Sequence, residues 1–230
     1  MATRIGLLLS GCGVQDGSEI SETILTLLAL ERAGADVLPL APDVMQAQVW
    51  NHFTGAESRE DNRNALTESA RLVRGKIASV NVVGAADLDA LILVGGYGAV
   101  KNLCNYATLG TGATVHPEVA RLVTELNGLG KPIGAMCIAP MVVAMALHGP
   151  RRAQPLTMTI GTNPETARDL GILGVRHMEA APDQICIDEA NNLVTTPAWM
   201  SAGSIAEAEP GITKLVQEVV RRAGELKELI

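Results

Sequence analysis

Three short apolar runs constrain the fold most, because each passes directly from continuous hydrophobic sequence into a turn. Residues 88–94 are apolar except for Asp89 and precede a Gly-Gly-Tyr-Gly turn at 95–98. Residues 5–9 precede a glycine-rich loop, and residues 133–136 lead straight into Cys137. Continuous hydrophobicity of this length is typical of strands that are buried on both faces of a parallel sheet, so we expect an α/β fold.

Segments with helical periodicity separate the apolar runs, as in a doubly wound sheet. Apolar residues recur at helical spacing over 20–34 and 115–128. Further helices are predicted at 62–73, 138–147, 164–170 and the C-terminus, and further strands at 37–40, 77–82, 156–160, 185–188 and 193–196. In such sheets the sites lie at the carboxyl ends of the strands, so the loops at 11–17 and 95–98 and the turn at Cys137 should converge.

The composition indicates one domain and limits its partners. Of the 230 residues, 47% are hydrophobic but only five are aromatic, which suits an aliphatic core in a single domain spanning residues 1–230. The net charge is −7 and Lys and Arg form no run, which argues against nucleic acid and anionic membrane surfaces as partners. Residues 1–10 suggest neither a signal peptide nor a membrane span, so the predicted location is cytoplasmic.

The four cysteines are the main candidates for chemistry. Cys12, Cys104, Cys137 and Cys186 form no C-x-x-C pair, so neither a disulfide framework nor a metal site is expected. Cys137 stands out because it lies between a buried strand and an apolar helix, as in a hydrolase nucleophile elbow. The positive end of that helix would lower the thiol pKa from about 8.5 to roughly 3.5–7.5 and favour a thiolate nucleophile. The alternative is a small buried hydrophobic residue.

A cysteine nucleophile needs a proton carrier, and two glutamates are candidates. Glu19 and Glu22 lie in the first turns of the helix that follows the 11–17 loop and share roughly one face. One would be the acid/base and the other would support the loop, but the residues alone do not decide which. The alternative is that both are present because acidic side chains stabilise helix N-termini.

Backbone amides near the elbow are candidates for oxyanion stabilisation. An amide of Gly95 or Gly96, together with that of Ile138, would stabilise an oxyanion or a hemithioacetal oxygen, unless the glycines form a plain turn. Asn102 is a candidate supporting residue. Cys12 follows a strand that ends at the same sheet edge as Cys137, which would allow a resolving or redox role, although packing is the preferred interpretation.

Dinucleotide binding is a competing interpretation, because Gly11 and Gly13 follow the first strand and Asp43 follows the second. The third glycine, Gly17, comes one place too late for the fingerprint. Acidic residues also crowd the position that a pyrophosphate would occupy. A nicotinamide cofactor is therefore not expected.

Several short motifs together resemble one known family. They are S-G-C-G at 10–13, G-S-E-I-S-E at 17–22, G-G-Y-G at 95–98, K-N-L at 101–103, M-C-I-A-P at 136–140 and T-T-P-A at 195–198. Over nearly the whole chain the combination is similar to the ElbB-type proteins, called isoprenoid-biosynthesis glyoxalases, of the ThiJ/PfpI (class I glutamine amidotransferase-like) superfamily. The resemblance implies a flavodoxin-like three-layer sandwich with a mostly parallel sheet, a nucleophile elbow and a homodimer.

By this resemblance Cys137 matches the family's nucleophilic cysteine, and Glu22 matches the glutamate whose carboxyl contacts it. Family members of the glyoxalase III type convert glyoxal or methylglyoxal to glycolate or lactate without glutathione, metal or other cofactor. The implied activity is a cofactor-independent lyase that acts on small 2-oxoaldehydes. Cys137 would add to the aldehyde, and protonated Glu22 would move protons between adjacent carbons through an enediol.

The sequence departs from the broader superfamily in one respect. Many members carry a histidine soon after the cysteine segment, and the corresponding region here, 156–160, has none. Amidotransferase or protease activity is therefore not expected, and the aldehyde chemistry is expected to be weak. Two other uses of Cys137 stay open, namely protein deglycation and a non-enzymatic stress or redox role in which the thiol is oxidised or engages a partner.

Overall fold

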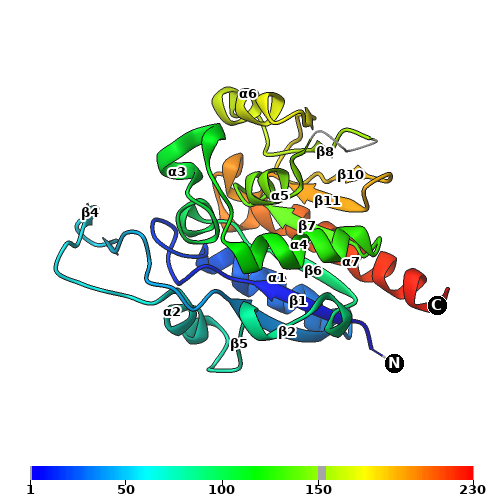
Figure 1. Cartoon of the computed structure of the whole chain (residues 1–230), viewed down its shortest axis with the longest axis horizontal. Coiled ribbons are helices and arrows are strands. Elements are labelled where there is room, and N and C mark those ends of the chain that lie inside the picture. The colour runs from blue at the N-terminus through cyan, green and yellow to red at the C-terminus, as the bar shows by residue number, and fades with distance from the viewer. Residues whose placement is uncertain (1, 150–153, 230) are drawn as a thin grey trace.

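The computed structural model describes residues 2–149 and 154–229, and a seven-stranded sheet forms its centre (Figure 1). The strand order is β10-β11-β7-β6-β1-β2-β5. Their bounds are β1 (Arg4–Leu8), β2 (Asp36–Ala41), β5 (Ala78–Ser79), β6 (Ala90–Leu93), β7 (Ile133–Met136), β10 (Cys186–Asp188) and β11 (Leu193–Thr196). Neighbouring strands are parallel except for β10 and β11, so the predicted mostly parallel α/β sheet is confirmed.

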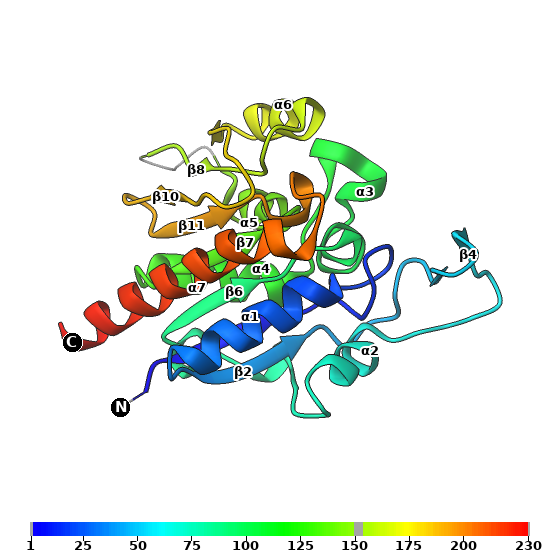
Figure 2. The ribbon, with the colours of Figure 1, turned by 180° about the vertical axis from the view of Figure 1, so that it is seen from behind.

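Helices cover both faces of the sheet and complete three layers. On one face lie α1 (Ile20–Arg32) and α7 (Ile205–Glu228), which pack against each other and stand in front of the sheet in Figure 2. Next to α1, α2 (Ala65–Leu72) packs against β2. On the other face α4 (Pro117–Gly128) packs against α5 (Pro140–Leu147). The flavodoxin-like three-layer sandwich expected from the sequence is confirmed.

The C-terminal helix α7 shows how the layers are held together. Its residues Leu215, Val216 and Val219 are fully buried. A side chain on Gly134 of β7 would place its Cβ 2.9 Å from Leu215 Cδ2, so glycine allows the helix to approach the strand closely. Each fully buried aliphatic side chain of this kind stabilises the fold by about 1.5–3 kcal/mol.

Smaller elements lie around this frame. A hairpin of β3 (Trp50–Asn51) and β4 (Ala56–Glu57) extends away from the sheet in both views (Figures 1 and 2). The others are α3 (Tyr106–Leu109), α6 (Pro164–Ile172), the pair β8 (Thr157–Met158) and β9 (Arg176–His177), a π-helix η3 (Ala99–Leu103), and the 3₁₀ turns η1 (Val80–Val82), η2 (Ala85–Asp87), η4 (Gly110–Gly112) and η5 (Ala198–Met200). In the part of the chain that the structure describes, no helix combines the length and hydrophobicity needed to cross a bilayer.

Two predicted strands are shorter than expected. The segment 156–160 contributes only β8, which pairs with β9 outside the main sheet, because Thr159 N donates to the Thr195 hydroxyl and not to a backbone carbonyl of a neighbouring strand. The segment 77–82 forms strand only at Ala78–Ser79. The Ser79 hydroxyl then caps Asn81 N and starts the 3₁₀ turn η1.

The centre of the sheet places three loops at one edge. Strands β7, β6 and β1 are adjacent, and Leu8 of β1 lies in register with Leu93 of β6, which lies in register with Ala135 of β7. The connections from β1 and β6 lead to opposite sides of the sheet, which makes this the topological switch point where ligands bind in open α/β sheets.

Candidate active site

Cys137 occupies a sharp turn between β7 and α5. Its φ is 58°, a left-handed conformation that is uncommon for residues other than glycine and is a form of stored strain. The turn is held because Cys137 N donates to Thr196 O of β11 at 3.0 Å, and α5 begins three residues later at Pro140. The side chain is only 7% exposed, and what is exposed lines a cleft.

The three loops converge as predicted from the sequence. Gly98 N donates to Gly17 O at 3.0 Å, and Glu19 N donates to Gly95 O at the same distance. Gly96 has a φ of 92°, and a Cβ there would lie 2.5 Å from Glu19 N. The backbones of the first and second loops therefore touch beneath the Cys137 turn.

Glu22 is fully buried beside the cysteine. Its Oε2 accepts a hydrogen bond from Gly95 N at 3.0 Å, its Oε1 accepts one from Trp199 N at 3.4 Å, and the carboxyl is hydrogen-bonded to the Cys137 thiol. Burial and then the nearby charge of Glu19 raise the pKa of Glu22 to about 8, although its hydrogen bonds oppose the shift. Glu22 is thus an acid that keeps its proton at neutral pH.

The prediction of a lowered cysteine pKa is wrong. Burial and the adjacent Glu22 carboxyl raise the pKa of Cys137 well above its usual value, while the backbone N–H groups of Gly96 and Ile138 bond to the sulfur and oppose the rise. A local sequence pattern reveals the helix end but not the loss of water around the thiol. Because Glu22 and Cys137 are so close in an interior site, at most one of them carries a negative charge.

Gly95 is required by the close approach of these two groups. A Cβ on Gly95 would lie 2.4 Å from Cys137 Cβ and 2.7 Å from Glu22 Oε2. Its amide is used by Glu22, whereas the amides that face the sulfur are those of Gly96 and Ile138. Of the three residues predicted to supply amides, two therefore face Cys137 and one positions Glu22.

The two glutamates have different positions. Glu19 is the N-cap of α1, and its Oε2 accepts hydrogen bonds from Glu22 N and from the Ser21 hydroxyl, both at 2.6 Å. Glu22, one turn later, reaches the thiol. Glu19 therefore fixes the start of the helix that carries Glu22.

Asn102 and Cys12 do not line the cleft. The buried Asn102 amide donates to Ser10 O at 2.7 Å and Asp16 O at 2.8 Å, and its oxygen accepts from Ala47 N. It therefore joins the first loop to the segment before β3. The charged groups that act on the Cys12 thiol belong to α2 and the neighbouring loops, and burial raises its pKa. All four cysteines are free thiols.

The cleft at Cys137 has a volume of about 510 Å³ and an aromatic wall. Four of the chain's five aromatic residues line it, namely Trp50, Tyr97, Tyr106 and Trp199. Lys101 also lines it, with Nζ 5.6 Å from the ring centre of Trp50 and 5.7 Å from that of Tyr97. This wall was not predicted from the sequence, although the rarity of aromatic residues in the chain was a usable signal.

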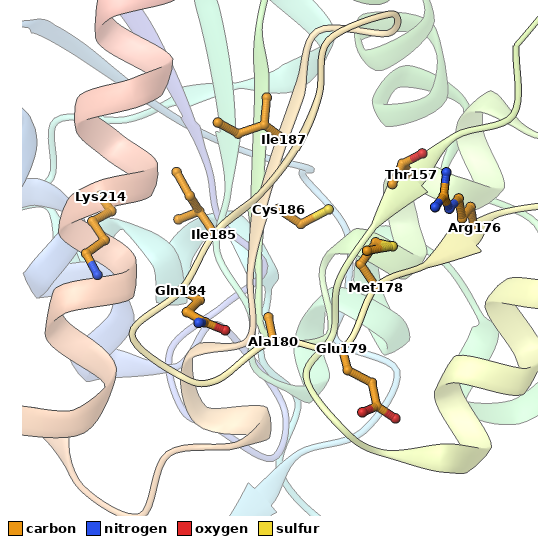
Figure 3. A pocket seen from close by; sticks show the side chains of 10 residues that line it. All are labelled: Thr157, Arg176, Met178, Glu179, Ala180, Gln184, Ile185, Cys186, Ile187 and Lys214. Atoms are coloured by element: carbon orange, nitrogen blue, oxygen red, sulfur yellow. The ribbon is translucent and has the colours of Figure 1, made fainter.

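A second hollow, of about 620 Å³, contains Cys186 (Figure 3). Arg176 of β9 and Lys214 of α7 reach it from opposite sides, with Cys186 of β10 between them. Cys186 is half-buried on an edge strand, and burial raises its pKa. This hollow is larger, but the buried acid near its thiol, Asp188, acts on Cys186 only through its charge and is not hydrogen-bonded to the sulfur, so the chemistry points to Cys137.

Metal ligands do not gather at either place. Within residues 2–149 and 154–229, no group of three or more His, Cys, Asp or Glu side chains could hold a metal ion. Among the described residues that line the Cys137 cleft there is no histidine either. Glu22 is the proton-carrying group in contact with the thiol.

Comparison with known proteins places this geometry in a family. No family model matches the chain. The glutamine amidotransferase-like class 1 domain-containing protein 3 of Homo sapiens is 40% identical over 233 residues, which cover 97% of this chain and 85% of that protein. The ES1 protein homolog of Rattus norvegicus is 39% identical over 96% of this chain and 85% of its own length. The chain belongs to this glutamine amidotransferase-like class 1 family.

Solved structures agree with the family assignment. An isoprenoid biosynthesis protein with an amidotransferase-like domain from Ehrlichia chaffeensis superposes with a TM-score of 0.86 at 30% identity, covering 95% of this chain and 99% of that one. DJ-1beta of Drosophila melanogaster has a TM-score of 0.58 at 19% identity, covering 99% and 97%, and shares the fold. The fold is therefore that of the ThiJ/PfpI/DJ-1 proteins.

The family corrects the predicted cytoplasmic location. Both the human and the rat relatives are named mitochondrial proteins, which contradicts that prediction. The prediction relied on the lack of a secretory signal or membrane span in residues 1–10. Neither feature distinguishes the cytoplasm from a mitochondrial compartment.

Proposed function

We propose that this family member is an ElbB-type, cofactor-independent glyoxalase that converts glyoxal to glycolate and methylglyoxal to lactate. The observation that carries the proposal is the hydrogen bond between the buried Glu22 carboxyl and the Cys137 thiol, with two backbone N–H groups directed at the sulfur. This arrangement unites a nucleophile, a proton carrier and electrostatic stabilisation in one small site.

The proposed reaction begins when the Cys137 sulfur adds to the aldehyde carbon. A C–S bond forms, the C=O π bond breaks, and the thiol proton ends on the aldehyde oxygen to give a hemithioacetal. Glu22 can relay that proton, because a protonated carboxyl donates through its O–H and accepts through its other oxygen. The amides of Gly96 and Ile138 offset the cost of negative charge on sulfur during the addition.

In the second step one oxygen of the Glu22 carboxyl takes the proton from the carbon that bears sulfur while its O–H gives a proton to the neighbouring carbonyl oxygen, which gives an enediol. Glu22 then gives a proton to the second carbon and takes the hydroxyl proton from the carbon that bears sulfur, which gives a 2-hydroxyacyl thioester. Water then breaks the C–S bond and releases the hydroxy acid and the thiol. One water is consumed and no electrons leave the substrate, so the balance requires no redox cofactor.

The burial of Cys137 favours a small free aldehyde over the other uses of this thiol. With the side chain only 7% exposed, an adduct on a protein surface would have difficulty in reaching the sulfur. The homodimer implied by the resemblance stays a prediction, which light scattering of the purified protein would test.

Counting product molecules tests the proposal. Purified protein is incubated with excess glyoxal, glycolate is quantified, and the intact mass of the protein is measured in parallel. We expect many glycolate molecules per chain and an unchanged final mass. Less than one glycolate per chain, or a permanent mass increase on Cys137, would contradict an enzyme and favour a sensor or a deglycase acting on other substrates.

A further inference from the structure

The cleft is larger than a two- or three-carbon aldehyde requires. Its volume of about 510 Å³ lies within the roughly 300–1,000 Å³ typical of sites for drug-sized ligands. Its wall includes four aromatic rings, which a glyoxal molecule bound at Cys137 would leave largely uncovered. The site therefore has room to recognise a part of the substrate beyond the reacting carbons.

Lys101 supplies a positive charge in this extra space. Among the described residues that line the cleft it is the single basic side chain. It comes from η3, which directly follows the 95–98 turn that supplies an amide to the Cys137 sulfur. The same short segment of chain thus positions both the reacting sulfur and the ammonium.

The N–H donors of the Lys101 ammonium are not all used within the protein. Nζ donates one hydrogen bond, to Gln15 O at 2.7 Å, and an ammonium has three N–H donors. Among the described residues, no carboxylate oxygen lies within the 4.0 Å ion-pair distance of Nζ. The rings of Trp50 and Tyr97 beside it reduce its contact with water, which strengthens its attraction for an anion.

The surrounding carboxylates do not neutralise this subsite. Burial lowers the pKa of Lys101, and the charges of the buried Asp16 and of Glu57 oppose that shift, so both carboxylates favour the charged form. Glu19 is occupied by its cap hydrogen bonds, and Glu165 lines the cleft from the exposed start of α6.

From these contacts we infer that Lys101 is a specificity-determining residue, which binds an anionic group at the far end of a 2-oxoaldehyde substrate while Cys137 attacks the aldehyde. The inference rests on the proposed glyoxalase function and narrows its substrate class to 2-oxoaldehydes that carry a carboxylate or phosphate.

A matched pair of substrates tests this class. The anionic probe is 4,5-dioxopentanoate, and the neutral probe is 2-oxopentanal, which has a methyl group in place of the carboxylate. For wild type we expect kcat/KM to be at least about 10-fold higher for the anion. Lys101→Met should lower kcat/KM for the anion by about 10-fold to 100-fold and for the neutral substrate by less than about 2-fold.

The control variant is Lys214→Met, which removes a lysine from the hollow in Figure 3 and should leave both values unchanged. Lys101→Arg should keep the preference for the anion. An equal fall in kcat/KM for both substrates in Lys101→Met, or no preference of wild type for the anion, would overturn the inference. A three-carbon 2-oxoaldehyde that carries a phosphate on its third carbon, tested in the same assay, distinguishes a phosphate subsite from a carboxylate subsite.

A second measurement does not depend on turnover. Iodoacetate and iodoacetamide are nearly equal in size but differ in charge, and their rates of reaction with Cys137 can be followed by peptide mass. The iodoacetate-to-iodoacetamide rate ratio should fall about 10-fold in Lys101→Met and not in Lys214→Met. If this ratio falls but no 2-oxoaldehyde is turned over, the anion subsite stands and the glyoxalase proposal fails. If the rate ratio is unchanged in Lys101→Met and 2-oxoaldehydes are still turned over, the anion subsite is rejected and the glyoxalase proposal stands.

Discussion

The hollow at Cys186 and the cleft at Cys137 are two cavities of similar size, about 620 Å³ and 510 Å³, and each contains a thiol whose pKa is raised by burial. They differ in the backbone. Cys186 lies in a regular antiparallel ladder opposite Thr195, where backbone groups are paired between strands. Cys137 lies at a strained turn that frees two amides toward its sulfur.

The acid makes the second difference. Cys186 is hydrogen-bonded to the Thr195 hydroxyl, which does not titrate near neutral pH, whereas Cys137 is bonded to a buried carboxyl with a pKa of about 8. A cavity and a thiol are therefore not enough for covalent catalysis. The turn and the acid distinguish the two regions, and each can be altered separately.

The largest expected effect comes from removing the two thiols in turn. Cys137→Ala should lower kcat for glyoxal by more than about 10³-fold, because no other group can form the hemithioacetal. Cys186→Ala should change kcat by less than about 2-fold, since the second hollow takes no part. Glycolate formation measures both. Comparable losses in the two variants would remove the distinction between the regions.

The next effect comes from adding one methyl group at the turn. Gly95→Ala would push a Cβ into Cys137 and Glu22, so kcat should fall by about 100-fold and the protein should lose about 1–3 kcal/mol of stability. Gly128→Ala is the matched control, because a Cβ there meets no atom within 4 Å. Chemical denaturation and kinetics measure both changes. A fully active Gly95→Ala protein would show that the close approach is unimportant.

Turnover at Cys137 and alkylation of Cys186 should change in opposite directions as the pH rises above about 8. Protonated Glu22 is required in the proposed reaction, so turnover should fall about tenfold per pH unit above its pKa of about 8. Alkylation of Cys186 should instead keep rising over the same range, because its thiolate fraction increases. A turnover rate that rises steadily through pH 9 would exclude a protonated Glu22.

The smallest expected effect concerns the support beneath the site. Asn102→Ala would leave buried backbone groups without partners and should cost about 1–3 kcal/mol of stability, with a change in kcat of less than about 10-fold. Asn81→Ala, on the exposed turn η1, should be nearly neutral. Thermal unfolding compares the two variants. A loss of kcat without a loss of stability would instead give Asn102 a direct role.

Much of the fold and the position of the site could be predicted from the sequence. The apolar runs at 88–94, interrupted only by Asp89, and at 133–136 identified buried parallel strands, because only a strand covered on both faces tolerates continuous hydrophobicity. Once the strands were parallel, their following loops had to meet at one edge. That geometry brought Cys137 near Gly96 without any knowledge of side-chain contacts.

The electrostatics could not be predicted in this way. The pKa of Cys137 depends on burial and on Glu22, which is far from it in sequence, whereas a local pattern reveals only the helix end. The choice between Glu19 and Glu22 depended on a cap hydrogen bond of 2.6 Å that selects the first as the N-cap. The strand predicted at 156–160 is limited to Thr157–Met158, because Thr159 N bonds to the Thr195 side chain and not to a backbone partner.

The most direct test of the account is the turnover of glyoxal by Glu22→Gln beside wild type. The amide has nearly the same shape and can still accept the hydrogen bond from Gly95 N, but it cannot carry a proton to and from carbon. We predict that kcat falls by about 10²-fold to 10⁴-fold while Cys137 can still be alkylated. A Glu22→Gln protein that retains kcat within about 3-fold of wild type would contradict the central claim that Glu22 and Cys137 act together.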